Sequence, residues 1–165
     1  MTAQRVRDLL GYDPQTGVFT WKATARRAVA GSVAGTIYKN GRRYITIGRQ
    51  RYFAHRLAWL YVHGRWPSAQ IDHRNMDRDD NRIENLREAT NQQNVANRGV
   101  MSSNHLGRKG VGISSDRVHA PQRYRARIRV NDKLIHLGYF STPDLASAAY
   151  AEAAVKHFGE FARSA

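Results

Sequence analysis

The chain has 165 residues, with 27 basic and 13 acidic side chains, so its formal net charge is +14. The length suits one ordinary domain or two small ones, and the absence of cysteine excludes disulfides and thiolate zinc sites. Twenty-two of the basic residues are arginines, whose planar guanidinium groups bind phosphate through paired hydrogen bonds. We therefore expect a polyanionic partner. A merely soluble basic protein is the alternative, and a membrane surface is not expected because the sequence shows no long apolar run.

The N-terminal part of the chain predicts two helices and several short strands. Thr2 can cap the first helix, which Gly11 would end, and residues 55–63 predict the second helix. Asn40-Gly41 lies between β-forming residues and predicts a hairpin with a type I′ turn, which needs positive φ at both positions. The expected strands are 18–21, 36–38, 43–47 and 51–54.

The middle of the chain predicts a β-β-α unit. Its strands are expected at 71–73 and 84–87, with a polar loop between them. Thr90 and Gln93 form a capping box that predicts a helix over 91–98.

A second unit is expected after a linker at 99–109, which is rich in Gly, Ser and Asn. Thr142 can cap an alanine-rich helix there, which Gly159 ends. The strands are expected at 111–114, 123–130 and 133–140. The predicted fold class is therefore α+β: a β-β-α unit preceded by hairpins and a helix, then a three-stranded antiparallel sheet packed on one helix.

An acidic residue beside a histidine, followed by two asparagines, gives the clearest chemical signal. Asp72 and Asn94 can each offer an oxygen to a hard divalent cation. His73 can take a proton from an attacking water near neutral pH, and an asparagine such as Asn85 can hold the imidazole in one orientation. Six of the 13 acidic residues lie within 72–88, as expected for a metal site in a basic groove. A solvated acidic loop is the alternative.

A row of arginines marks the strand at 123–130. Arg123, Arg125, Arg127 and Arg129 alternate with other residues, so all four side chains lie on one face of the strand. Such a row is costly unless an anion covers it, and a sheet face of this width can enter the major groove of DNA. The alternative is a solvated face with carboxylates opposite, for which Asp132 is a candidate.

Two parts of the chain resemble known families. Residues 12–98 resemble the HNH homing endonucleases of phage and intron type, through Tyr12-Asp13-Pro14, Thr16-Gly17, Trp21, Ala54-His55-Arg56-Leu57-Ala58-Trp59, Ile71-Asp72-His73, Asp80-Asn81-Arg82, Asn85-Leu86-Arg87, Asn91, Asn94 and Asn97. Residues 105–161 resemble the Apetala-type (ethylene-response-factor) DNA-binding domain, through Gly110-Val111, Tyr124-Arg125-Ala126-Arg127-Ile128, Leu137-Gly138-Tyr139-Phe140, Ala146, Ala148-Ala149-Tyr150 and Ala153-Ala154.

The first resemblance implies roles in catalysis. Asp72 and Asn94 would ligate one metal ion, His73 would be the general base, and Asn85 would orient His73. Because one ligand is an amide oxygen, the metal would be Mg²⁺ or Mn²⁺. The domains would be an HNH nuclease domain at 1–98, with its core at 71–98, and an Apetala-type domain at 110–165.

Together the resemblances imply hydrolysis of double-stranded DNA to 5′-phosphate and 3′-hydroxyl ends. The four strand arginines would read the site, and further phosphate contacts are expected from Arg74, Arg78, Arg82 and Arg87. We expect a monomer that binds neither a small-molecule cofactor nor a membrane. Its expected location is the cytoplasm of a bacterium or of a phage-infected host. The rival functions are a non-catalytic DNA-binding regulator, an RNA-cleaving enzyme and a resolvase of branched DNA.

Overall fold

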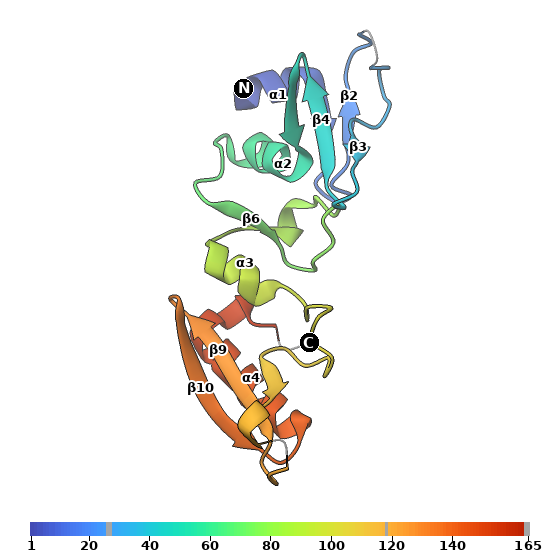
Figure 1. Ribbon diagram of the computed structural model, residues 1–165. Coiled ribbons are helices and arrows are strands. Elements are labelled where there is room, and N and C mark those ends of the chain that lie inside the picture. The colour runs from blue at the N-terminus through green and yellow to red at the C-terminus, as the bar shows by residue number, and fades with distance from the viewer. Residues whose placement is uncertain (26–27, 118, 164–165) are drawn as a thin grey trace. The chain divides into compact units, whose positions relative to one another are not determined.

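The computed structural model of the chain describes residues 1–25, 28–117 and 119–163 (Figure 1). The chain divides into two compact units, Met1–Ala89 and Thr90–Ala165. Its described residues combine α-helices with several small antiparallel sheets, an arrangement compatible with the predicted α+β class. None of the described helices is long and apolar enough to cross a membrane.

The first unit contains two helices, α1 (Ala3–Leu9) and α2 (Ala54–His63), and a short 3-10 turn, η1 (Ile83–Asn85). Its strands are β1 (Leu10–Tyr12), β2 (Phe19–Trp21), β3 (Thr36–Ile37), β4 (Arg43–Ile47), β5 (Gln50–Phe53), β6 (Gln70–His73) and β7 (Leu86–Ala89). They pair antiparallel as β1-β2, β3-β4-β5 and β6-β7.

One hydrophobic core joins these elements. Val6 of α1, Phe19 of β2, Ile45 of β4 and Leu57 of α2 are fully buried in it. Ile71 of β6 and Leu86 of β7 belong to the same core. The candidate residues Asp72 and His73 therefore follow a core residue on a strand whose place is fixed by packing.

Two local predictions for this unit were wrong in detail. Gly11 does not end α1, because the helix closes at Leu9. Gly11 lies in β1 and pairs with Thr20 of β2, and the extended backbone carries the fully buried Leu10 into the core. At the Asn40-Gly41 turn the hairpin is confirmed, but positive φ is found at Gly41 and not at Asn40. The Asn40 side chain instead accepts a hydrogen bond from the Arg42 amide, with an N···Oδ1 distance of 3.1 Å.

The strand expected at 84–87 begins later, at Leu86. Glu84 and Asn85 lie in η1, where the Asn85 main-chain carbonyl accepts a hydrogen bond from the Arg74 amide at 2.9 Å. The 3-10 turn therefore occupies the positions where the strand was expected to begin, and one hydrogen bond continues the pairing beyond His73 and Leu86.

The second unit contains α3 (Asn91–Asn97), α4 (Pro143–Phe158) and two 3-10 turns, η2 (Ser115–Arg117) and η3 (Gly159–Phe161). Its strands β8 (Val111–Ile113), β9 (Tyr124–Val130) and β10 (Lys133–Phe140) form an antiparallel sheet in the order β10-β9-β8. Helix α4 packs against this sheet through Ala146, Tyr150 and Ala154. The capping box at Thr90 and Gln93 is confirmed.

Helix α3 groups with the second unit, so the division at 89/90 lies nine residues before the predicted end of the nuclease domain at 98. The helix packs against α4 and η3. At its C-terminal end, the Lys109 ammonium donates to the main-chain carbonyls of Ala96 and Arg98. Lys109 thereby fastens the predicted linker at 99–109 to the helix. The domain assignments 1–98 and 110–165 stay predictions.

Candidate active site and nucleic-acid interface

A buried ion pair spans the β6-β7 ladder of the first unit. Asp72 lies directly opposite Arg87 in the register, so both side chains point to the same face of the ladder. Arg87 Nε and Nη2 each lie 2.9 Å from Asp72 Oδ2, and both residues are less than 8 % exposed. The guanidinium therefore compensates the buried carboxylate and fixes its orientation.

His73 follows Asp72 at the end of β6 and is also buried. Its ring meets the ring of His55 edge-on, with centroids 5.1 Å apart and an interplanar angle of 76°. Burial and the nearby Arg42 lower the pKa of His73, against smaller raising effects from Asn81, Asp72 and Asp77. The imidazole is consequently neutral near pH 7, the state that a general base requires.

His55, whose ring contacts that of His73, lies in the first turn of α2. Burial, followed by His73 and Arg42, lowers the pKa of His55 to about 2. Its Nδ1 atom is buried and has no hydrogen-bond partner among the described residues. His55 is thus a neutral imidazole packed against the candidate base. From the sequence alone, a histidine at the start of a helix is expected to be structural more often than functional.

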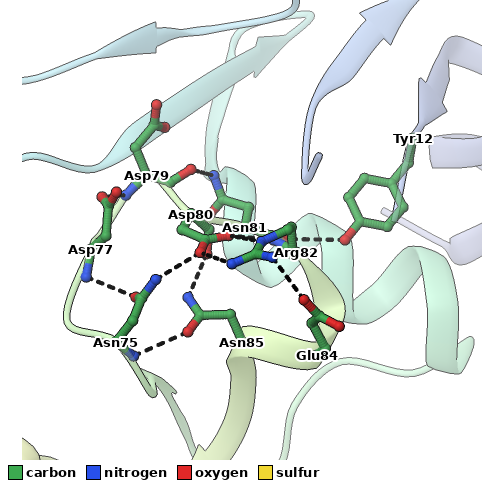
Figure 2. Close-up of polar contacts among 9 residues, drawn as sticks. All are labelled: Tyr12, Asn75, Asp77, Asp79, Asp80, Asn81, Arg82, Glu84 and Asn85. Carbon is green, nitrogen blue, oxygen red and sulfur yellow. Dashed lines mark hydrogen bonds and ion pairs between the residues drawn. The ribbon is translucent and has the colours of Figure 1, made fainter. Parts of the chain in front are cut away.

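The loop between β6 and β7 is organised around Asp80 (Figure 2). Its carboxylate accepts hydrogen bonds from Arg82 Nε at 2.9 Å and Nη2 at 2.7 Å, and from Asn75 Nδ2 at 2.7 Å. These contacts, with the Arg82 side chain first, lower the pKa of Asp80 to about 2. Arg82 also lies 2.8 Å from Glu84. Its guanidinium is therefore engaged by two carboxylates.

Asn85 makes its side-chain hydrogen bonds within the same loop. Its Nδ2 donates to the Asp80 carbonyl at 2.9 Å, and its Oδ1 accepts from the Asn75 amide at 3.1 Å (Figure 2). Asn81 is the amide residue that acts on the pKa of His73. The orienting role predicted for Asn85 stays a prediction, and Asn81 is a second candidate that the sequence analysis did not single out.

The backbone of this loop contacts two N-terminal residues, Tyr12 and Gly17. Tyr12 of β1 donates its hydroxyl to the Asn81 carbonyl at 2.8 Å (Figure 2), and burial raises the pKa of Tyr12 to about 12. At Gly17, where φ is +73°, a Cβ atom would fall 2.4 Å from the Arg82 amide nitrogen. Only glycine allows this close approach. Contacts far apart in sequence therefore hold the loop in shape.

The predicted phosphate contacts next to the ladder differ in their surroundings. Arg74 and Arg78 are exposed, whereas Arg82 is half-buried and Arg87 is buried. For Arg82 and Arg87, a phosphate would compete with the carboxylates that already engage them. Their DNA-binding roles stay predictions, as does that of Arg74.

The second predicted metal ligand, Asn94, lies on α3 of the second unit and is half-buried. The described residues contain no group of three or more His, Cys, Asp or Glu side chains that could hold a metal ion. A carboxylate and an amide oxygen are nevertheless a hard donor pair, and they suit a cation that keeps several of its waters, such as Mg²⁺. The chemistry of the donors fits the predicted cation, and the roles of Asp72 and Asn94 stay predictions.

The arginine row of β9 faces a groove of about 740 Å³ within the second unit. Arg125, Arg127 and Arg129 line the groove, and Arg125 Nε is buried with no hydrogen-bond partner among the described residues. Apolar side chains complete its lining, among them Val95, Met101, Leu106, Ile113 and Leu134. The groove thus offers both cations and apolar surface.

One carboxylate acts on this row without pairing with it: the charge of Arg125, behind the Ser114 hydrogen bond, helps to lower the pKa of Asp116. Within the part of the chain that the structure describes, none of Arg123, Arg125, Arg127 and Arg129 forms an ion pair. Asp132, the predicted alternative partner, accepts from Arg129 Nη1 through its main-chain carbonyl at 3.2 Å. The row thus forms no ion pair that an external anion would have to displace, and Asp116 offsets only the charge of Arg125.

Comparison with known families gives one match, at residues 52–96, to the family described as HNH endonuclease. No curated protein matches the chain. The matched segment runs from β5 to α3, about a quarter of the chain, and contains all four predicted catalytic and metal-binding positions. The Apetala-type resemblance of the second unit is not part of this match and stays a proposal. The chain therefore carries an HNH endonuclease domain at residues 52–96.

Proposed function

We propose that this protein is a metal-dependent DNA endonuclease of the homing type. The observation that carries the proposal is the HNH endonuclease match over residues 52–96. Within that segment, a buried carboxylate adjoins an imidazole whose lowered pKa suits a general base. The proposed product ends are a 5′-phosphate and a 3′-hydroxyl.

In the proposed mechanism, His73 Nδ1 or Nε2 accepts a proton from the water that attacks phosphorus in line. Asp72 and Asn94 would hold one Mg²⁺ or Mn²⁺ ion, and Arg87 keeps the Asp72 carboxylate in one orientation. When bound, the cation supplies charge neutralisation at the phosphate and at the departing 3′ oxygen. Asn85 or Asn81 would limit rotation of the imidazole.

The second unit is the proposed site-reading module, similar to an Apetala-type domain. Its unpaired Arg125, Arg127 and Arg129 and the groove before them support contact with duplex DNA. Arg123, the residue just before β9, extends the row. A monomer with one catalytic set would nick one strand.

The proposal is tested by incubating the purified protein with host and phage duplex DNA and Mg²⁺, then mapping the ends on each strand. His73→Ala should slow cleavage by about 10²- to 10⁴-fold, while its DNA affinity stays within a few-fold of wild type. EDTA should stop cleavage, and Mg²⁺ or Mn²⁺ should restore it.

The same assay separates the rival functions. DNA binding without cleavage under any divalent cation would identify a non-catalytic regulator. Preferential cleavage of RNA or of branched DNA over linear duplex would identify an RNase or a resolvase. Nicking by purified His73→Ala protein at the wild-type rate would refute the assignment of the base.

A further inference from the structure

Arg42 lies outside the matched segment, in the turn that joins β3 to β4. The turn fixes its backbone, because the Arg42 amide donates to Asn40 Oδ1 at 3.1 Å and its carbonyl accepts from the Tyr38 amide at 3.0 Å. Its guanidinium lies over the ring of Phe53, with 5.7 Å from Cζ to the ring centroid. The side chain is therefore held in a defined place and is half-buried.

This guanidinium reaches the imidazoles of the candidate site. Arg42 Nη1 lies 3.4 Å from His55 Nε2, and the rings of His55 and His73 are in contact. The positive charge of Arg42 also contributes to the lowered pKa of both histidines. Arg42 is thus part of the electrostatic environment of the candidate base.

No carboxylate compensates Arg42 among the residues that the structure describes. The charge with the largest effect on the Arg42 pKa is another cation, Arg78, whose Nη1 donates to the Asn40 carbonyl at 2.9 Å. Burial and Arg78 lower the pKa of Arg42. The next residue in sequence is the opposite case, since Arg43 pairs with Asp79 through two contacts of 3.0 and 2.8 Å.

A partly buried cation without a counter-ion costs free energy of folding. Such a group is retained where an external anion completes its pairing, and the reaction proposed for this site brings a phosphodiester to His73. The guanidinium fork matches the geometry of phosphate oxygens. Both the missing counter-ion and the place beside the imidazoles therefore point to the same ligand.

We propose that Arg42 contacts the scissile phosphodiester, donating from its guanidinium to a non-bridging phosphate oxygen. This assignment rests on the proposed nuclease function and adds to it a residue from the N-terminal hairpin. Arg78 contributes by holding the Asn40 turn that presents Arg42.

The test compares Arg42→Gln and Arg42→Lys with Arg49→Gln, in the full chain with Mg²⁺ and a duplex whose nick site has been mapped. Arg49 is a matched control because it is an exposed arginine in the turn between β4 and β5 of the same sheet. Arg42→Gln should lower kcat by about 10²-fold or more, Arg42→Lys should recover part of that loss, and Arg49→Gln should leave kcat unchanged.

Thermal unfolding distinguishes phosphate contact from a structural role. Because Arg42→Gln removes a partly desolvated charge next to Arg78, its melting temperature should equal or exceed that of wild type. A loss of activity that parallels a lower melting temperature would assign Arg42 a structural role and overturn the inference.

A second measurement uses a duplex with one uncharged methylphosphonate at the mapped position, with binding measured in EDTA. Arg42→Gln should weaken binding to the ordinary duplex by about tenfold and have no effect on the methylphosphonate duplex. An equal loss on both duplexes would overturn the assignment.

If wild type does not nick DNA at all, the proposed function fails and this inference fails with it. If wild type nicks and Arg42→Gln nicks equally well, the inference alone fails.

Discussion

Arginines have different surroundings in the two units of the chain. In the first unit Arg43, Arg82 and Arg87 each lie within 2.9 Å of a carboxylate oxygen. On β9 of the second unit, by contrast, Arg125 and Arg127 form no ion pair among the described residues. In the paired residues, a carboxylate offsets the cost of desolvation, so their contribution is to the stability of the fold. The unpaired residues keep their charge available for an anion that a partner brings.

The largest effect is expected at the most deeply buried pair. Arg87→Met would leave Asp72 buried without its cation, and should lower the free energy of unfolding by about 3–5 kcal/mol. Urea denaturation measures this loss. Replacing both charges, by Asp72→Leu together with Arg87→Met, should recover much of it. If Arg87→Met is as stable as wild type, the ion pair does not stabilise the fold. The contrast between ion-paired and unpaired arginines would then lose its structural half.

Gly110 packs closely against β9, the strand that carries Arg125, Arg127 and Arg129, and a substitution there tests this packing. At this glycine, where φ is +71°, a Cβ atom would lie 2.1 Å from the Tyr150 ring and 2.7 Å from the Arg127 carbonyl. Gly110→Ala should therefore cost about 1–3 kcal/mol or more through overpacking, measured by urea denaturation. At Gly107, φ is also positive but no atom lies within 4 Å of the added Cβ. Gly107→Ala should thus show only the smaller cost of the backbone conformation.

Local sequence patterns predicted the second unit well because its signals are short-range. The alternation in β9 and the capping box at Thr90 depend on neighbouring residues alone, and both were confirmed. Asn131-Asp132, between β9 and β10, has positive φ at both positions, 47° and 61°. The type I′ pattern expected at Asn40-Gly41 is found here instead.

The candidate site of the first unit was less predictable because its contacts are long-range. The sequence does not show that Tyr12 donates to Asn81, 69 residues away, or that Arg42 reaches His55. Nor can it tell a buried arginine such as Arg87 from an exposed one such as Arg74 when both stand near acidic residues. Asp72 and His73 were predicted as site residues from their chemistry and from the resemblance, whereas Asn81 and Arg42 became candidates only with the structure.

A moderate effect is expected at Asp80, whose pKa is lowered from 3.8 to about 2 by Arg82 and Asn75. Because the folded-state pKa is lowered, the stabilisation is complete above about pH 4 and is lost as the pH falls through about 2. Asp80→Asn should therefore cost about 1 kcal/mol at neutral pH. The difference from wild type should shrink as the pH falls from about 4 toward about 2. Urea denaturation across this range measures it, and a pH-independent difference would show that the charge of Asp80 is not responsible.

The smallest effect on stability is expected in the unpaired row. Arg125→Ala and Arg127→Ala remove no ion pair among the described residues, so each should change the free energy of unfolding by less than about 0.5 kcal/mol. Each should nevertheless lower the slope of log affinity against log salt concentration by about 0.9 for every lost phosphate contact. Lys156→Ala is the control, because Lys156 is exposed on α4, and α4 packs on the side of the sheet that Ala126 and Ile128 face. Its salt slope should match wild type. If the arginine variants also match wild type in slope and affinity, the row is a solvated face, and the contrast between paired and unpaired arginines carries no functional meaning.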